Sequence, residues 1–149
     1  KRRHVGYMSH KTGPGHNDFS RQIPIYIDPL TRGTIWLKPV FVLVNQGVYS
    51  AANDFVLRLK GLPHVRIIGV KTGGGAGLPM SSELPNGWGI RFSASRTYDT
   101  AGKDVEFGIE PDIKVEGELK RTDEKDLFID ASARLLTVWI KAIKKHLKK

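Results

Sequence analysis

The sequence contains no cysteine among its 149 residues. This absence excludes disulfide bonds, thiolate metal sites and a cysteine nucleophile, but it leaves both oxidising and reducing compartments open. The chain also lacks a run of about eighteen apolar residues, and its basic start at residues 1–4 is not followed by an apolar stretch. We therefore expect no membrane span, and no signal peptide is visible in this chain.

Acidic residues are too few to balance the basic ones, so the formal net charge is +9 and the isoelectric point is near 9.9. Much of the excess lies at the two ends of the chain, with five lysines between residues 141 and 149. Lysines that end a helix complement its dipole. No aromatic residues are interleaved with the basic ones, as they are in proteins that bind single strands. We therefore expect no specific nucleic-acid partner.

A nucleotide-binding loop is also missing. Residues 71–77 hold four glycines and Lys71, but the stretch follows neither the Walker spacing nor the G-x-G-x-x-G pattern that opens a helix. We expect neither a nucleotide nor a metal ion nor any other cofactor.

Hydrophobic patterning predicts an α/β fold in a single domain at residues 1–149. The continuous run of β-branched and aromatic residues at 39–45 is typical of a central parallel strand, and residues 65–70 indicate a second one. A helical pattern begins at Ser50 and stops at Gly61 and Pro63. Together these elements predict a right-handed βαβ unit with parallel strands.

The other segments are predicted to add to this unit. Residues 1–37 have no sustained period, and we expect an irregular connecting segment with an edge strand at residues 22–27. The Asn86-Gly87 pair predicts a hairpin between strands at 80–84 and 88–95. Helical spacing of apolar residues predicts a long amphipathic helix at 123–149, so that residues 38–115 form the core.

Ser50 lies where the strand at 39–45 gives way to the helix, and α/β proteins usually place their chemistry at the carboxyl ends of such strands. Two interpretations are open. Serine is a preferred helix N-cap, although Asn53 is not the Glu or Gln of a full capping box. Alternatively, Ser50 is a nucleophile, and the N–H of Ala51 with the helix dipole stabilises an oxyanion. The spacing is not the G-x-S-x-G elbow of α/β-hydrolases.

Four blocks in order resemble the landmarks of the S41 peptidases, the family of C-terminal-processing and tricorn-type serine proteases. They are VLVNQGVYSAA at 42–52, IIGVKTGGG at 67–75, LPNG at 84–87 and FGIEPD at 107–112. The resemblance implies a crotonase-like or Clp-protease-like ββα core with a mainly parallel sheet, an added β-hairpin and a long C-terminal helix. It places the nucleophile on Ser50, and the oxyanion or substrate beside Ala51, Gly47, Gly73, Gly74 and Gly75.

The glycine-rich loop indicates a branch of that family. In the C-terminal-processing branch a lysine of this loop is the base, but Gly75 stands in its place here, and Lys71 matches a position outside that dyad. The loop is similar to that of the tricorn and retinoid-binding-protein-like branch, where a histidine activates the serine and an acidic residue supports the site. Glu106 resembles that acidic residue, its alternative being an exposed carboxylate at a strand end. Asp112 is expected to make a structural turn.

The histidine and the second oxyanion donor of that branch are expected well upstream. The chain has five histidines, none of which matches the branch's histidine motif: His4, His10, His16, His64 and His146. Because a serine hydroxyl without a base is a weak nucleophile, we expect a serine endopeptidase domain that is truncated upstream and inactive in isolation.

The alternative function is a nonenzymatic member of the same fold that binds a peptide or an apolar ligand. The expected partners are a peptide or protein substrate and the upstream domains of the parent chain, and the sequence leaves an oligomer open. The resemblance also implies a location in the cell envelope, the periplasm or outside the cell.

Overall fold

The computed structural model describes residues 1–115 and 127–146 and contains the expected βαβ unit. Strand β3 (Val40–Val44) runs into helix α1 (Ala51–Leu59), which returns the chain to strand β4 (Val65–Gly69). The two strands pair in parallel from Val40 with Val65 to Val44 with Gly69, and the short strand β8 (Ile113–Lys114) joins the other edge of β4. The α/β class and the parallel sheet are therefore confirmed.

A second sheet is built from a segment that was expected to be irregular. Strand β1 (Arg3–His10) lies between β2 (Ile23–Ile27) and β7 (Ser95–Tyr98), and both pairings are antiparallel. The prediction of irregular chain was wrong for residues 3–10, although β2 does lie at an edge. A bulge between His4 and Gly6 breaks the alternation of β1. A Cβ at position 6 would overlap the Tyr98 carbonyl, so this glycine permits the strand pairing.

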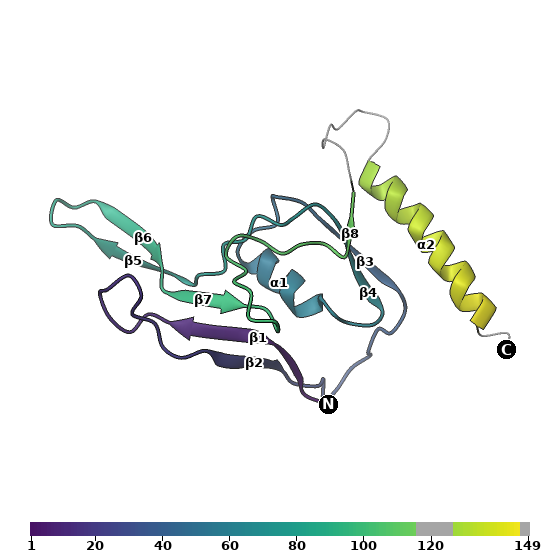
Figure 1. Cartoon of the computed structure of the whole chain (residues 1–149), viewed down its shortest axis with the longest axis horizontal. Coiled ribbons are helices and arrows are strands. Elements are labelled where there is room, and N and C mark those ends of the chain that lie inside the picture. Colours follow the sequence, from purple (N-terminus) through teal and green to yellow (C-terminus); the bar gives the residue numbers. More distant parts are fainter. Residues whose placement is uncertain (116–126, 147–149) are drawn as a thin grey trace.

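The hairpin of β5 (Pro79–Glu83) and β6 (Gly89–Ser93) confirms the Asn86-Gly87 prediction. The pairing runs from Pro79 with Ser93 to Glu83 with Gly89, and all ten strand residues are exposed. The hairpin projects away from the two three-stranded sheets (Figure 1). Parallel pairing is thus confined to β3, β4 and β8, while the other five strands pair antiparallel.

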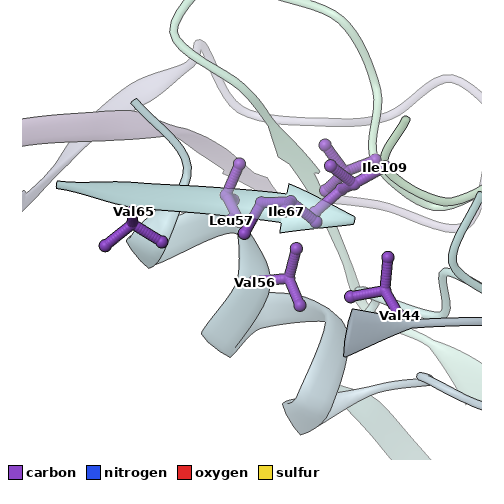
Figure 2. Packing of buried hydrophobic residues seen from close by; sticks show 7 residues of the cluster. Val44, Val56, Leu57, Val65, Ile67 and Ile109 are labelled. Atoms are coloured by element: carbon purple, nitrogen blue, oxygen red, sulfur yellow. The ribbon is translucent and has the colours of Figure 1, made fainter. Parts of the chain in front are cut away.

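The hydrophobic core lies between α1 and the parallel sheet (Figure 2). Helix α1 buries Val56 and Leu57 against a group of apolar residues from β3, β4 and the segment before β8: Val44, Val65, Ile67, Val105 and Ile109. The apolar spacing of residues 51–62 predicts that Phe55 faces inward and that Asn53 faces outward. The structure differs, because Phe55 is 57% exposed whereas Asn53 is fully buried. The helix is rotated so that positions 53, 56 and 57 face inward, which is the i, i+3, i+4 pattern of one helix face.

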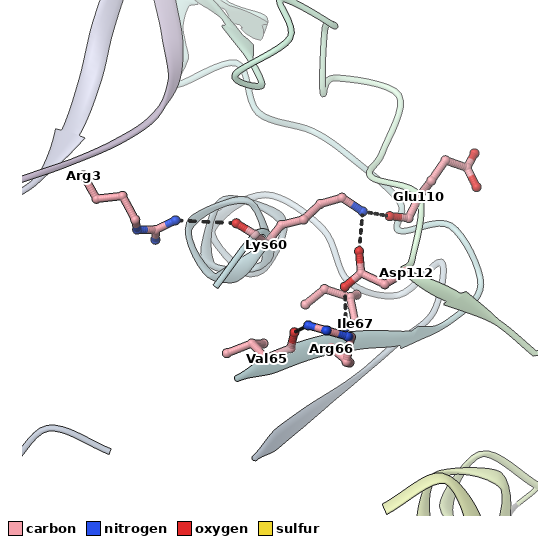
Figure 3. A network of polar contacts seen from close by, with 7 residues as sticks. All are labelled: Arg3, Lys60, Val65, Arg66, Ile67, Glu110 and Asp112. Atoms are coloured by element: carbon pink, nitrogen blue, oxygen red, sulfur yellow. Dashed lines mark hydrogen bonds and ion pairs between the residues drawn. The ribbon is translucent and has the colours of Figure 1, made fainter. Parts of the chain in front are cut away.

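Polar contacts at the end of α1 hold three elements together (Figure 3). The guanidinium of Arg3 in β1 donates to the carbonyl oxygen of Lys60, where a cation favours the negative end of the helix dipole. The Lys60 ammonium lies 3.2 Å from Asp112 Oδ1, and Asp112 Oδ2 accepts the N–H of Ile67 in β4 at 2.9 Å. Asp112 therefore has a structural role, as expected.

Helix α2 (Leu127–His146) contacts β3 and β4 and lies beyond the parallel sheet in Figure 1. Residues 123–126 and 147–149, which were predicted to belong to this helix, lie outside the described residues. Neither helix of the described segments is long and apolar enough to cross a membrane.

Candidate active site

The backbone of Ser50 is strained. Its φ of 56° and ψ of −123° fall in a region that non-glycine residues rarely adopt, and strain of this kind concentrates at functional sites. Ser50 occupies the N-cap position of α1, but its side chain makes no capping hydrogen bond. Capping therefore does not explain the serine. The sharp turn from strand to helix presents an exposed Ser50 at the end of β3.

Backbone hydrogen bonds hold this strained turn in place. The N–H of Ser50 donates to the carbonyl oxygen of Gly74 at 2.8 Å, and the carbonyl of Ser50 accepts from Asp54 at 3.0 Å. Ala51 is the first residue of α1, so its N–H has no acceptor within the helix and lies at the positive end of the helix dipole. Its place at the start of α1 fits the oxyanion donor that the sequence predicts, and the role itself stays a prediction.

The glycine-rich loop fits tightly around Ser50. A Cβ at position 73 would overlap the Gln46 carbonyl oxygen, and a Cβ at 74 would overlap the carbonyl oxygen of Glu106. Gly75 has a φ of 76°, and a side chain there would meet the ring of Tyr49. These three positions therefore require glycine.

The amides of the loop are largely committed to the protein itself. The N–H of Gly73 donates to Val48 at 2.9 Å, and that of Gly75 donates to the carbonyl of Glu106 at 2.8 Å. The carbonyl of Gly74 accepts from Ser50. The placement of Gly73, Gly74 and Gly75 beside an oxyanion or substrate stays a prediction; the structure shows that the N–H groups of Gly73 and Gly75 are already hydrogen-bonded within the protein.

Glu106 is brought to the same place as Ser50. Its carboxylate accepts the N–H of Ala76 at 2.9 Å, and its own N–H donates to Asp104 Oδ1 at 2.8 Å. Both Ser50 and Glu106 line one pocket of about 440 Å³. The side chain is half-buried, so Glu106 is not simply an exposed carboxylate at a strand end.

Ser50 lies between two pockets. The wall of the larger one consists of Tyr49, Ser50, Gly75, Gly77, Pro79, Arg91, Phe92, Ser93 and Glu106. A second pocket of about 210 Å³ also includes Ser50, together with Ala51 and the ion pair of Asp54 with Arg58, whose atoms lie 2.6 Å apart. A peptide lying across Ser50 would have room on both sides of the reacting bond.

A buried polar network lies directly behind Ser50, and sequence reasoning missed it. Asn53 Nδ2 donates to the carbonyl of Val105 at 3.2 Å, while its Oδ1 accepts the hydroxyl of Thr72 at 2.6 Å. The Thr72 hydroxyl in turn accepts the N–H of Ile109 at 2.6 Å. The network ties the first turn of α1 to the glycine-rich loop and to the segment that carries Glu106.

Other candidates are not brought to the serine. Gly47 donates its N–H to Asn45 Oδ1 at 2.8 Å and shapes the turn after β3, but it lines neither pocket. Lys71 also lines neither. The pKa of the Glu110 carboxyl is lowered by a hydrogen bond from Lys114, and the positive charge of Lys71 adds to this effect.

None of the histidines that the structure describes lines either pocket of Ser50. His4 packs against Tyr7 and Tyr26 in the antiparallel sheet. His16 lines a neighbouring pocket. A base that would activate Ser50 is thus not present among the histidine and lysine side chains of the described residues that surround it.

Comparison with known proteins agrees with this geometry. The model of peptidase family S41 matches residues 2–115. A crystal structure of a candidate peptidase from Parabacteroides merdae is 47% identical with a TM-score of 0.83, and the match covers 91% of this chain and 43% of that one. The chloroplastic C-terminal processing peptidase of Tetradesmus obliquus is 31% identical over 86 residues, or 57% of this chain and 18% of the relative.

The structure of mature CPAF complexed with lactacystin is 28% identical with a TM-score of 0.58, and the match covers 65% of this chain and 20% of CPAF. The chain thus spans less than half the length of each of these three relatives. The family match extends over most of the chain and includes the Ser50 turn, the glycine-rich loop and Glu106. This chain belongs to peptidase family S41.

Proposed function

We propose that this chain is the C-terminal part of the catalytic domain of a serine endopeptidase and that Ser50 is its nucleophile. The observation that supports this role most strongly is the strained, uncapped conformation of Ser50 between two pockets. The similarity to a C-terminal processing peptidase supports the reaction class.

In the proposed reaction Ser50 Oγ attacks the carbonyl carbon of the peptide bond, and its proton passes to a base. The N–H of Ala51 donates to the oxyanion of the tetrahedral intermediate, which is stabilised further by the positive end of α1. Collapse of the intermediate breaks the C–N bond, and the base returns the proton to the leaving amine. Water then hydrolyses the acyl-enzyme and frees Ser50.

The base and a second oxyanion donor come, in this proposal, from residues that precede the chain in its parent protein. Gly75 supports a histidine base over a lysine, because a side chain at this position would meet the ring of Tyr49 and would strain a backbone with φ of 76°. This favours the tricorn-like branch and its crotonase-like core. Glu106 would orient the base or bind the amino end of the substrate.

Peptide hydrolysis by two proteins tests the proposal: the 149-residue chain, and the same chain preceded by the upstream part of its reading frame. We expect the first to be inactive and the second to cleave an unstructured protein such as casein. Ser50→Ala should abolish that activity, whereas Ser81→Ala, at an exposed hairpin serine that lines neither pocket, should retain it. Activity that survives Ser50→Ala would contradict the nucleophile. Peptide binding without any hydrolysis would favour the nonenzymatic alternative.

From the family resemblance we also propose a location in the cell envelope, the periplasm or outside the cell. Fractionation of the source cells, followed by detection of the protein with an antibody, tests this: a protein found only in the cytoplasmic fraction would contradict it.

A further inference from the structure

The pocket that contains Ser50 and Glu106 adjoins another of about 510 Å³. The two share Ser93 and Glu106, so they form one groove that leads away from the serine. The wall of the outer pocket comes from the loop after β1, the end of β6, the start of β7 and the segment before β8. It consists of Lys11, His16, Phe19, Ser93, Arg96, Asp104, Glu106 and Phe107. We call this combined space the Ser50 groove.

Three cations line the Ser50 groove, and none of them has an ion-pair partner in the described part of the chain. The guanidinium of Arg91, in the same pocket as Ser50, makes neither a hydrogen bond nor an ion pair with any described residue. The guanidinium of Arg96 stacks on the Phe19 ring at 4.1 Å from its centroid. The Lys11 ammonium lies 4.9 Å from the same ring and donates to backbone carbonyls, including that of His16 at 3.3 Å. Because the Phe19 ring and the backbone carbonyls carry no net charge, Arg96 and Lys11 can still pair with an anionic ligand.

The two carboxylates of the groove, Glu106 and Asp104, do not neutralise these cations. Glu106 accepts the N–H of Ala76, and Asp104 accepts the N–H of Glu106, so both are held by backbone amides. Backbone amides stabilise a carboxylate without bringing a positive charge. The groove therefore combines three cations that have no ion-pair partner among the described residues with two carboxylates, and Arg91 is the cation that lines the same pocket as Ser50.

We propose that the Ser50 groove selects peptides that carry a carboxylate, with Arg91 as its principal contact. An unpaired guanidinium binds a carboxylate through two parallel hydrogen bonds, which combine charge with direction. Arg96 and Lys11 extend the attraction along the groove. The carboxylate is either an acidic side chain near the cleaved bond or the C-terminal carboxylate of the peptide. This inference rests on the proposed function, because it names the substrate class of the same site.

Binding of fluorescein-labelled peptides to the 149-residue chain, followed by anisotropy, tests the inference without catalysis. Three peptides of one length are compared: one with an internal glutamate and an amidated C-terminus, one with glutamine and a free C-terminal acid, and one with glutamine and an amide. At low salt we expect at least one carboxylate peptide to bind about tenfold more tightly than the neutral one, a typical effect of one charge-assisted hydrogen bond. The tighter of the two identifies the source of the carboxylate.

Variants show whether Arg91 is responsible. Arg91→Gln should remove the preference, and Arg91→Lys should restore part of it, because lysine keeps the charge but not the paired geometry. The matched control is Arg32→Gln, an exposed arginine that lines neither part of the groove. Rising salt should reduce the preference. Equal affinity for all three peptides, or a preference that survives Arg91→Gln, would overturn the inference.

The inference and the proposed function fail separately. Ser50→Ala removes the nucleophile but should leave the carboxylate preference of binding unchanged. Hydrolysis that depends on Ser50 together with equal binding of the three peptides would therefore refute only the substrate class. A carboxylate preference in a protein without Ser50-dependent hydrolysis would refute only the peptidase.

Discussion

Replacing Thr72 by valine should destabilise the protein strongly, although the two side chains have nearly the same shape. The Thr72 hydroxyl donates to Asn53 Oδ1 and accepts the N–H of Ile109, both at 2.6 Å. Thr72 is 3% exposed and Asn53 is fully buried, so water does not replace the lost hydrogen bonds. Each buried polar group that is left unpaired costs about 1–3 kcal/mol, and two such groups give an expected loss of about 2–6 kcal/mol. That is a large share of the stability of an ordinary domain.

Urea unfolding followed by circular dichroism measures this loss as a change in the free energy of unfolding. The matched control is Thr137→Val, because the hydroxyl of Thr137 donates to Ala133 at 2.9 Å on the exposed surface of α2; we expect it to cost less than about 0.5 kcal/mol. The double variant with Asn53→Ala should be less destabilised than the sum of the single variants. A Thr72→Val cost no larger than that of the control, or fully additive effects, would refute the reasoning.

Three further substitutions test other parts of the structure. Gly74→Ala should cost more than about 3 kcal/mol of unfolding free energy, because its Cβ would overlap a backbone carbonyl. Gly61→Ala is the control: position 61 has a φ of 82° but open space around it, so this variant should cost about 1 kcal/mol. Equal costs would contradict the packing of the loop. Asp112→Ala should cost about 1–2 kcal/mol and Asp112→Asn less, since asparagine keeps an acceptor for the backbone of β4; equal losses in urea unfolding would show that this acceptor is unimportant. Lys114→Gln should raise the lowered pKa of Glu110 in an NMR titration. A carboxyl whose pKa is lowered in the folded state stabilises the protein at pH values above its unfolded pKa, and this stabilisation is lost as the pH falls through the folded-state pKa. The unfolding free energy of Lys114→Gln should therefore depend less on pH in the acid range. An unchanged Glu110 titration would contradict the contact.

Local patterns were sufficient to predict the central unit. The β-branched run at 40–44 and the glycine and proline after α1 fix β3, α1 and β4, and Asn86-Gly87 fixes the hairpin. Ser50 attracted attention because it lies in the turn between β3 and α1, although β3 itself proved to be a partly exposed edge strand rather than a central buried one. These features depend on residues close together in the sequence, where propensity and periodicity operate.

Features that depend on distant residues could not be predicted. Asn53 looks like a surface residue until Thr72 and Val105, which are 19 and 52 residues away, supply its hydrogen bonds. Gly6 is a loop marker by composition, yet it allows β1 to approach Tyr98 closely. In both cases tertiary contacts override the local preference.

The Ser50 groove is a further example. Its cations come from two stretches far apart in the sequence, Lys11 in one and Arg91 with Arg96 in the other. The pairing of β1 with β7 brings these stretches to one place. Net charge alone therefore gave no indication of where a charged substrate would bind.

The most direct test of the central claim is covalent labelling of the upstream-extended protein with a fluorophosphonate probe, which reacts with activated serines. Mass spectrometry of the digested product locates the adduct. We expect one adduct on the peptide that contains Ser50, and none after Ser50→Ala. An adduct on another serine, or no adduct on a protein that hydrolyses peptides, would contradict Ser50 as the nucleophile.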